Sequence, residues 1–565
     1  MTTPVIDSFV ALHGGQNSYA DPLLLKPEEF ARGVNMSIRG GLAKTRPGFV
    51  EETVPNMPTG VFQGADRWSL DGGDYIVFVV AGHVYAIAVD TNVLTDLGLL
   101  LDPTADQCWF CQADRYLVIQ DGASAPVVLY EDTVPTVYAG EQSIPIGTVM
   151  YFVFQRLHVA VNDPGLMYFK SGDIFTPTTP ASCLRFIEGE YWGTGGAHCL
   201  PLELGHIYGM DAFRNAATGT GVGTLLAFAR NGVVAYDFSV PRLDWPEVNT
   251  AQVLFTNAGC KSPWSTLAVN DDLMYRGVDG LRTVRYTATS VGSSSGALSN
   301  LPMSLRVSTW FDSEVRSYLK YVSTAFWNNY ALVTVAGTDT RYFQGIVALD
   351  TAATHALAGN SNPAFPGVWT GYSFAQVVNA ERLGRNEVFV FVEGPRLLRL
   401  DEDATQDVDS AGESVNIESR LVTRSYNFGD AGMVKKLQHL DLWLSGIYVD
   451  STISVYFRPT GYPKWCLMGS REVEAAAGYP GYRRRLRFSI EDATQFCNTM
   501  TKELLPVGTE FQFAIEIEGS ATLERGLAHA TREVEAPPDP CDVALSTGTL
   551  TGSDLDDWSY SAEGE

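Results

Sequence analysis

The sequence predicts an all-β chain whose central part is a β-propeller of six or seven blades, with an N-terminal arm and a C-terminal β-sandwich. Three observations predict this fold class. A short apolar strand, a Gly-containing turn and a second apolar strand recur seven times between residues 70 and 401. The first turn glycines are 40 and 43 residues apart, which is the length of a four-stranded blade. The 53 glycines and the 11% aromatic content suit many short strands joined by tight turns.

Each of the seven repeats has the form of a β-hairpin, because Gly accepts the positive φ that a tight turn needs. The turn glycines are Gly82, Gly122, Gly165, Gly232, Gly280, Gly337 and Gly394. The later spacings, 48 to 67 residues, predict insertions near residues 172–205 and 239–262. A lone hairpin leaves its apolar faces and edges open, whereas blades around one axis bury them. The alternative, a row of β-sandwiches, would need about 100 residues per domain.

Four regions are expected along the chain. Residues 1–50 are predicted to be an extended arm that packs as an interface segment, with one helical turn at Lys26–Arg32. Residues 51–415 are the propeller. Residues 416–535 alternate apolar and polar residues like the strands of a β-sandwich. Residues 536–565 are rich in Pro, Ser, Gly and acidic residues, and this composition predicts a flexible acidic tail.

The net charge of −26 is concentrated in particular regions. Residues 416–532 hold 14 basic and 13 acidic residues, and residues 533–565 hold nine acidic residues and no Lys or Arg. Residues 1–415 therefore carry about −18. Such a surface repels duplex DNA and anionic lipid. The same charge can also serve solubility alone.

One basic run stands out in the predicted sandwich, from Arg483 to Arg487. Strand alternation would place Arg485 and Arg487 on one face, and Arg484 with Leu486 on the other. Two interpretations remain open for this run. It is either a nucleic-acid site or a strand exposed to solvent or ion-paired with acidic neighbours.

No catalytic, cofactor or metal motif is found. Cys108 and Cys111 have the spacing of a redox or zinc pair, but lie in a strand-like context without a second pair, so two buried thiols are expected. Gly219–Gly223 lacks the spacing and the following helix of a dinucleotide loop. The histidines are dispersed, at His13, His83, His158, His198, His206, His355, His439 and His529. We therefore expect a protein that is not an enzyme, with no catalytic residues, cofactor or metal.

The termini and the apolar runs do not suggest a membrane protein. Met1–Leu25 has no Lys or Arg and no compact apolar stretch, so it is not expected to be a signal peptide. The most apolar run, Tyr75–Val89, is interrupted by a Gly-containing turn and predicts a hairpin. We expect folding in a cytoplasm and no direct membrane insertion.

Several short motifs resemble the tail tubular protein B family, which forms the nozzle of podovirus tails. Related tail-hub and DNA-stabilisation proteins of short-tailed phages share the opening of the sequence. The matching residues are Gly14-Gly15-Gln16-Asn17, Asn35, Gly41, Arg46-Pro47-Gly48-Phe49, Gln155-Arg156-Leu157, Tyr168–Phe175, Tyr342–Asp350, Trp369 and Arg424–Gly429. The similarity extends over most of residues 1–530.

This resemblance implies a structural virion protein that is assembled in the host cytoplasm and located in the phage tail. Family members form a sixfold ring that attaches to a tail adaptor protein and carries fibres or spikes. Its channel retains the genome end and conducts double-stranded DNA without sequence-specific binding. Arg46, Pro47 and Gly48 are then candidates for an interface motif, although a turn entering a strand explains Pro47 and Gly48 equally well.

Two other functions remain open. A receptor-binding propeller would expose aromatic side chains such as Trp192 or Trp245 to stack on glycans. A glycan-degrading enzyme would need two carboxylates about 5–10 Å apart, which distant blades could supply. The sequence leaves open the blade number, the ring stoichiometry, and which acidic residues line a channel.

Overall fold

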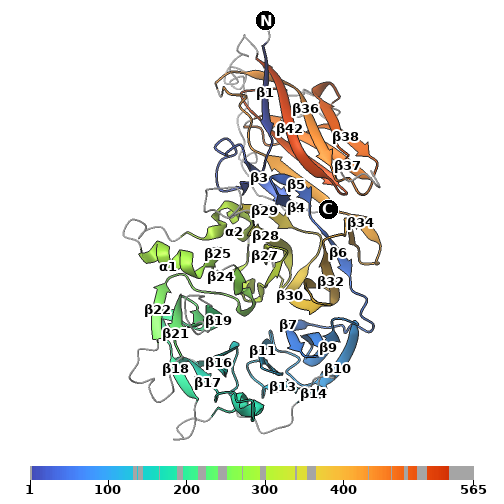
Figure 1. Ribbon diagram of the computed structural model, residues 1–565. Helices are drawn as coiled ribbons and strands as arrows, with labels where there is room; N and C mark the ends of the chain where they lie inside the picture. The colour runs from blue at the N-terminus through green and yellow to red at the C-terminus, as the bar shows by residue number, and fades with distance from the viewer. Residues whose placement is uncertain are drawn as a thin grey trace, which may run out of the picture.

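The structure is a computed structural model in which the strands form two bodies (Figure 1). The propeller occupies the lower part of the view and the β-sandwich the upper part. The described residues are 3–130, 136–137, 144–163, 166–186, 195–213, 224–238, 251–269, 272–292, 301–312, 314–337, 340–352, 364–430, 432–459, 461–475, 482–492 and 506–532. Several residues named in the sequence analysis lie outside them: Gly165, Trp192, Trp245, Gly219–Gly223, His355 and the predicted tail 536–565.

The propeller prediction is confirmed, and the described residues form seven blades. Every predicted hairpin becomes a pair of antiparallel strands within one blade, and each blade lies in its own part of the ring (Figure 1). The first blade contains β7 (Phe62–Leu70), β8 (Gly73–Val80), β9 (His83–Ala88) and β10 (Val93–Leu99). The second contains β11 (Trp109–Ala113), β12 (Tyr116–Gln120), β13 (Val127–Tyr130) and β14 (Thr136–Val137).

The next three blades continue in chain order. The third blade contains β15 (Met150–Val153), β16 (Arg156–Asp163), β17 (Leu166–Ser171) and β18 (Gly196–Cys199). The fourth contains β19 (Ile207–Phe213), β20 (Thr224–Ala229), β21 (Gly232–Tyr236) and β22 (Ala251–Thr256). The fifth has three strands, β23 (Leu267–Val269), β24 (Asp272–Arg276) and β25 (Leu281–Thr283). The strand expected over Leu281–Tyr286 ends early, because helix α1 (Val284–Gly292) begins there.

The last two blades complete the ring. The sixth contains β26 (Thr324–Trp327), β27 (Tyr330–Gly337), β28 (Phe343–Asp350) and β29 (Ala364–Trp369). The seventh contains β30 (Phe374–Arg382), β31 (Arg385–Val392), β32 (Arg396–Asp401) and, from far upstream, β6 (Gly48–Glu51). Short helical segments join the blades: η2 (Leu202–Leu204), η4 (Pro263–Ser265), η5 (Met303–Val307), α2 (Ser308–Asp312) and η6 (Arg316–Tyr321). Another, η1 (Pro180–Leu184), lies within the third blade between β17 and β18.

The first strands of neighbouring blades contact one another around the ring. β7 contacts β11, β11 contacts β15, and β15 contacts β19; η4 then lies between β19 and the fifth blade. β23 contacts β26, β26 contacts β30, and β30 returns to β7. The pairing of β6 with β32 in the seventh blade ties the start of the chain to the end of the propeller.

Side-chain amides join neighbouring blades in a repeated way. The amide of Gln376 accepts from Ala65 N at 2.9 Å and donates to Ala65 O at 2.7 Å, so it pairs with that backbone as another strand would. We call such two-bond pairs amide clasps. The other clasps join Gln112 to Ser69, Asn162 to Ile207, and Asn379 to Phe326.

The second body is a β-sandwich built from both ends of the chain. One sheet contains β1 (Thr3–Phe9), β4 (Met36–Arg39), β5 (Leu42–Thr45), β36 (Lys435–Ser445), β39 (Arg484–Ser489), β40 (Val507–Gly508) and β42 (Thr522–Arg532). The other contains β2 (Gly15–Gln16), β3 (Glu29–Val34), β35 (Glu418–Thr423), β37 (Ser451–Pro459), β38 (Cys466–Val473) and β41 (Phe511–Glu518), and it continues into the sixth blade through the pairing of β3 with β29. The hairpin of β33 (Gln406–Val408) and β34 (Ser414–Asn416) precedes it, and η7 (Ile490–Asp492) follows β39.

The N-terminal segment differs from the expected extended arm. Strands β1 to β5 pair within the sandwich, and β6 pairs within the propeller. The helical turn expected at Lys26–Arg32 is absent from these described residues, because β3 starts at Glu29 and pairs with β35. Phe9, Phe30, Met36 and Ile38 are buried in the sandwich core, and this burial holds the segment in place.

Candidate functional site

The candidate interface residue Arg46 lies at the junction of the two bodies. Its side chain is buried, and all five guanidinium N–H groups have partners. Two bonds go to the carboxylate of Asp407, at 2.9 and 2.5 Å, and one goes to Asn35 Oδ1 at 2.9 Å. The others go to the carbonyl oxygens of Thr370 and Pro47. Arg46 therefore connects strands of the propeller and the sandwich within one chain.

Asn35 and Gly48 complete this junction. Asn35 has φ of 53°, a left-handed conformation that Asn tolerates, and its amide bonds to the backbone of Thr370 and Glu418. A Cβ on Gly48 would lie 2.0 Å from Gln406 O, so only glycine allows β6 to pass so close to that segment. Pro47 lies between these residues and is partly buried.

The cysteine pair Cys108 and Cys111 is buried. Burial raises the pKa of Cys108 to about 12 and also raises the pKa of Cys111. Both side chains therefore remain protonated thiols near neutral pH, in which form they are poor nucleophiles and poor metal ligands. Their positions agree with the expectation of buried thiols.

A cleft of about 560 Å³ opens on the seventh blade beside β6. Its lining residues are Glu52, Arg382, Leu383, Arg385, Glu387 and Arg399. Burial works to raise the pKa of Glu52, but hydrogen bonds from Asn92 and Arg399 and the charge of Arg382 outweigh it and lower that pKa. Because Glu52 pairs with Arg382 and Arg399, this cleft links β6 to the seventh blade through ion pairs.

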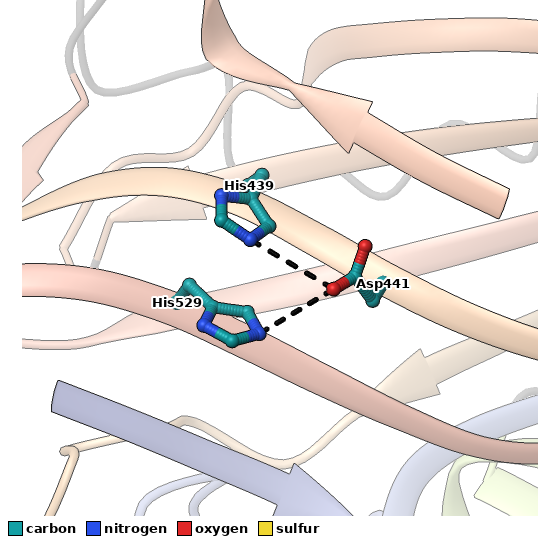
Figure 2. A group of neighbouring side chains, drawn as sticks. All are labelled: His439, Asp441 and His529. Carbon is teal, nitrogen blue, oxygen red and sulfur yellow. Dashed lines mark ion pairs between the residues drawn. The ribbon is translucent and has the colours of Figure 1, made fainter. Parts of the chain in front are cut away.

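The most concentrated group of chemically active side chains lies on the sandwich, where β36 pairs with β42 (Figure 2). His439 and Asp441 are two residues apart on β36 and therefore point to the same face. His529 on β42 lies directly opposite His439 in the register. The two imidazole rings stack, with centroids 4.2 Å apart and planes 19° apart. Both Nε2 atoms face Asp441 Oδ2, at 3.8 Å from His439 and 3.5 Å from His529.

The carboxylate of Asp441 is fully buried and held by two arginines of β39. Arg487 donates to both oxygens, at 2.8 and 3.1 Å, and Arg485 donates to Oδ2 at 2.6 Å. Burial works to raise the pKa of Asp441, but these hydrogen bonds outweigh it and lower that pKa to about 2. Asp441 is therefore ionised at all ordinary pH values. Arg485 and Arg487 share one face, as alternation predicted, and are ion-paired with an acidic neighbour.

The two histidines are only partly exposed, at 20% and 22% of their side-chain surface. Burial lowers the pKa of both, and for His439 the neighbouring His529 lowers it further. Their Nε2 atoms are buried and have no hydrogen-bond partner. Neutral imidazole nitrogens beside an ionised carboxylate are the donor set that borderline divalent cations prefer.

The remainder of this face is cationic and aromatic. Trp443 follows Asp441 on the same side of β36, with the guanidinium of Arg525 4.0 Å from its ring centroid and that of Arg485 5.1 Å away. Arg483 at the end of the sheet pairs with Glu524. The local arginine excess explains how a single buried carboxylate is tolerated here.

The sequence did not reveal the histidine cluster, because His439 and His529 are far apart in the chain. One part of the cluster could have been predicted from the sequence. His439 and Asp441 are two residues apart in a strand, so both potential ligands lie on one face. The third ligand depends on the pairing of β36 with β42, which the sequence pattern of neither strand specifies.

Comparisons with known proteins concern the fold alone. No family model matches the chain, and no curated protein does. Among solved structures, the chain is similar to the β-propeller domain of Cps50 (Swd1) from Myceliophteria thermophila, with 10% identity, a TM-score of 0.35, and coverage of 62% of this chain and 99% of that one. A chain of the mitotic checkpoint complex matches at 12% identity with a TM-score of 0.38, covering 63% and 94%.

A third similar structure is an exo-β-1,3-galactanase from Phanerochaete chrysosporium with galactose, at 8% identity and a TM-score of 0.25, covering 86% of this chain and 100% of that one. Among the described residues, no helix is long and apolar enough to cross a bilayer. The propeller and sandwich assignments rest on the strand pairing itself.

Proposed function

We propose that this chain is a non-catalytic structural protein of a short-tailed bacteriophage tail, where copies of it form the nozzle. In this proposal six copies make a ring between the tail adaptor protein and the outer end of the tail. Its central channel retains the genome end and conducts DNA during ejection. Fibres or spikes attach around it.

One observation carries the proposal: five residues of the family resemblance, which are Gly15, Asn35, Arg46, Gly48 and Trp369, lie together at the junction between propeller and sandwich. Asn35 and Arg46 form its buried hydrogen-bond network, and Gly48 passes close to Gln406. Gly15 lies against the backbone of Phe365, and the indole of Trp369 donates to Met36 O at 2.8 Å. These residues are far apart in the sequence, so a shared architecture explains their joint occurrence better than separate local turns do.

The charge distribution supports the proposed channel. DNA moves through a channel most freely when no part of the wall binds its phosphates, and a basic wall would bind them strongly. Residues 1–415, which include all seven blades and the N-terminal strands of the sandwich, carry about −18. An acidic wall repels the duplex from all sides and keeps it near the axis.

Negative-stain images of the purified full-length chain, together with light scattering, test this proposal. We expect rings with sixfold symmetry and an open centre, either from the chain alone or after addition of the tail adaptor protein. A chain that remains monomeric in both conditions, or that forms closed particles without a channel, would overturn the proposal.

A further inference from the structure

We propose that His439, Asp441 and His529 form a binding site for a divalent transition-metal cation, of which Zn²⁺ is the best fit. The site lies on the outer face of the sandwich and is separate from the proposed nozzle function. In it the cation would join β36 to β42 through side chains of both strands.

The strand geometry places three ligands around one point. Residues two apart on a strand share a face, and directly paired residues of neighbouring strands have Cβ atoms about 4.5–5.5 Å apart. His439 and Asp441 meet the first condition, and His439 and His529 meet the second. A ligand atom from each of the three residues lies within 4.8 Å of the others.

The distances suit a small tetrahedral ion. Zn²⁺ bonds of about 2.0–2.1 Å give ligand–ligand distances of roughly 3.4 Å in a tetrahedron. The two Nε2 atoms are 3.5 and 3.8 Å from Asp441 Oδ2, too long for hydrogen bonds but close to that value. Figure 2 shows both rings turning a nitrogen toward the same oxygen. A small rotation of the stacked rings would direct both lone pairs to one ion, and water would complete the coordination.

The unpaired ring nitrogens give a second, independent reason. Both Nε2 atoms are buried without a hydrogen-bond partner, although buried polar atoms normally have one. A cation bound by both would satisfy them together. Arg487, which donates to both carboxylate oxygens, would then act as the outer partner that orients the ligating carboxylate.

Arg485 and Arg487 limit the affinity of this site for a divalent cation. Two guanidinium groups beside one carboxylate leave the surroundings with a net positive charge, which repels a cation. Both side chains are about half exposed, at 51% and 54%, so water screens this repulsion. Arg485 also occupies Oδ2, the oxygen that faces the histidines. We therefore expect binding in the micromolar range, and expect Arg485 to weaken it.

Isothermal titration of chelator-treated full-length chain with ZnCl₂ tests the inference. The wild type should bind one ion at this site, His529→Gln should lose that binding, and the control His13→Gln should retain it. Arg485→Ala should bind roughly tenfold more tightly, because a cation and a competing donor are removed. X-ray absorption at the zinc edge should show mixed nitrogen and oxygen ligands.

Three results of this experiment would overturn the proposed metal site. The inference is overturned if the wild type shows no saturable binding while circular dichroism shows it folded. Equal binding by wild type and His529→Gln would indicate adventitious binding only and would also overturn it. Unchanged or weaker binding by Arg485→Ala would contradict the proposed competition, and with it the assigned site. None of these results depends on whether the chain forms a ring.

Discussion

At the scale of single residues, buried charge is tolerated where every donor has a partner. Arg46 uses all five N–H groups inside the chain, and Asp441 accepts from two arginines. A buried ion pair adds modest net stability, but removing one partner leaves the other charge buried and unpaired. The junction and the outer sheet therefore depend on individual side chains.

The substitution Arg46→Met should lower the free energy of unfolding by about 3–5 kcal/mol, because the buried carboxylate of Asp407 would lose its ion-pair partner. Arg420→Met is the matched control, since Arg420 is partly exposed and pairs with the partly exposed Glu516. Arg420→Met should lower the free energy of unfolding by no more than about 1 kcal/mol. Urea denaturation followed by tryptophan fluorescence measures both; equal costs would contradict the role given to Arg46.

Two histidines, His158 and His198, should make the stability of the protein depend on pH. Burial lowers the pKa of His158 to about 3 and that of His198 to about 4, from 6.5. The unfolded chain therefore binds more protons below pH 6.5, so stability is full above that value and is lost as the pH falls towards 4. His198 alone accounts for roughly 3 kcal/mol of this loss.

The variant His198→Phe tests this pH dependence. The ring lies among Phe169, Tyr236 and Phe238, so phenylalanine can occupy the site without a titrating group. The difference in urea midpoint between pH 7.5 and pH 4.5 should be smaller than in the wild type. An identical difference would show that His198 is not titrating as described.

At the scale of elements, the amide clasps explain how separate sheets hold together around the ring. Each clasp supplies two hydrogen bonds from one side chain to the backbone of a neighbouring blade. These bonds occur at blade boundaries, where no strand ladder is available. The clasps therefore supplement hydrophobic packing with a directional link.

The substitution Gln376→Leu should destabilise the propeller by about 2–3 kcal/mol, because it leaves Ala65 N and Ala65 O buried without partners. Leucine keeps the size and apolar packing of the side chain. The control Gln406→Leu removes one hydrogen bond to Asn416, at a partly buried hairpin. Chemical denaturation should show a larger decrease in the free energy of unfolding for Gln376→Leu than for Gln406→Leu. A smaller or equal decrease for Gln376→Leu would contradict the role given to the clasp.

The closure of the seventh blade gives another element-scale prediction. Gly48→Ala would place a Cβ 2.0 Å from Gln406 O, so β6 must shift away from its pairing with β32. We expect a loss of at least about 2 kcal/mol and faster hydrogen exchange in residues 48–51. Gly432→Ala, with its nearest neighbouring atom at 3.8 Å, should be close to neutral. Exchange in residues 48–51 as slow as in the wild type would count against the closure.

At the scale of the whole molecule, the sequence predicted the parts that local patterns encode. All seven predicted hairpins appear as pairs of antiparallel strands, because the apolar strand pattern is local. Among the described turn glycines, Gly82, Gly122, Gly280 and Gly394 have the expected positive φ, whereas Gly232 and Gly337 lie within strands. The role of residues 3–51 was not predictable in this way. Strands such as β1 and β6 are stabilised by partners more than 300 residues away, for example Phe9 opposite Gly526 and Phe49 opposite Leu400.

The same limit applies to the candidate site. Alternation along the basic run correctly placed Arg485 and Arg487 together, because it depends on one strand only. Their partner Asp441, and the pairing of His439 with His529, depend on three strands from different parts of the chain. A site made by sheet register is visible only when the register is known.

The most direct test of the proposed nozzle is single-particle cryo-electron microscopy of the full-length chain assembled with its tail adaptor protein. The account predicts a sixfold ring in which each copy shows a seven-bladed propeller joined to the sandwich, around an open channel with acidic walls. Isolated copies, or a channel lined mainly by Lys and Arg, would contradict it.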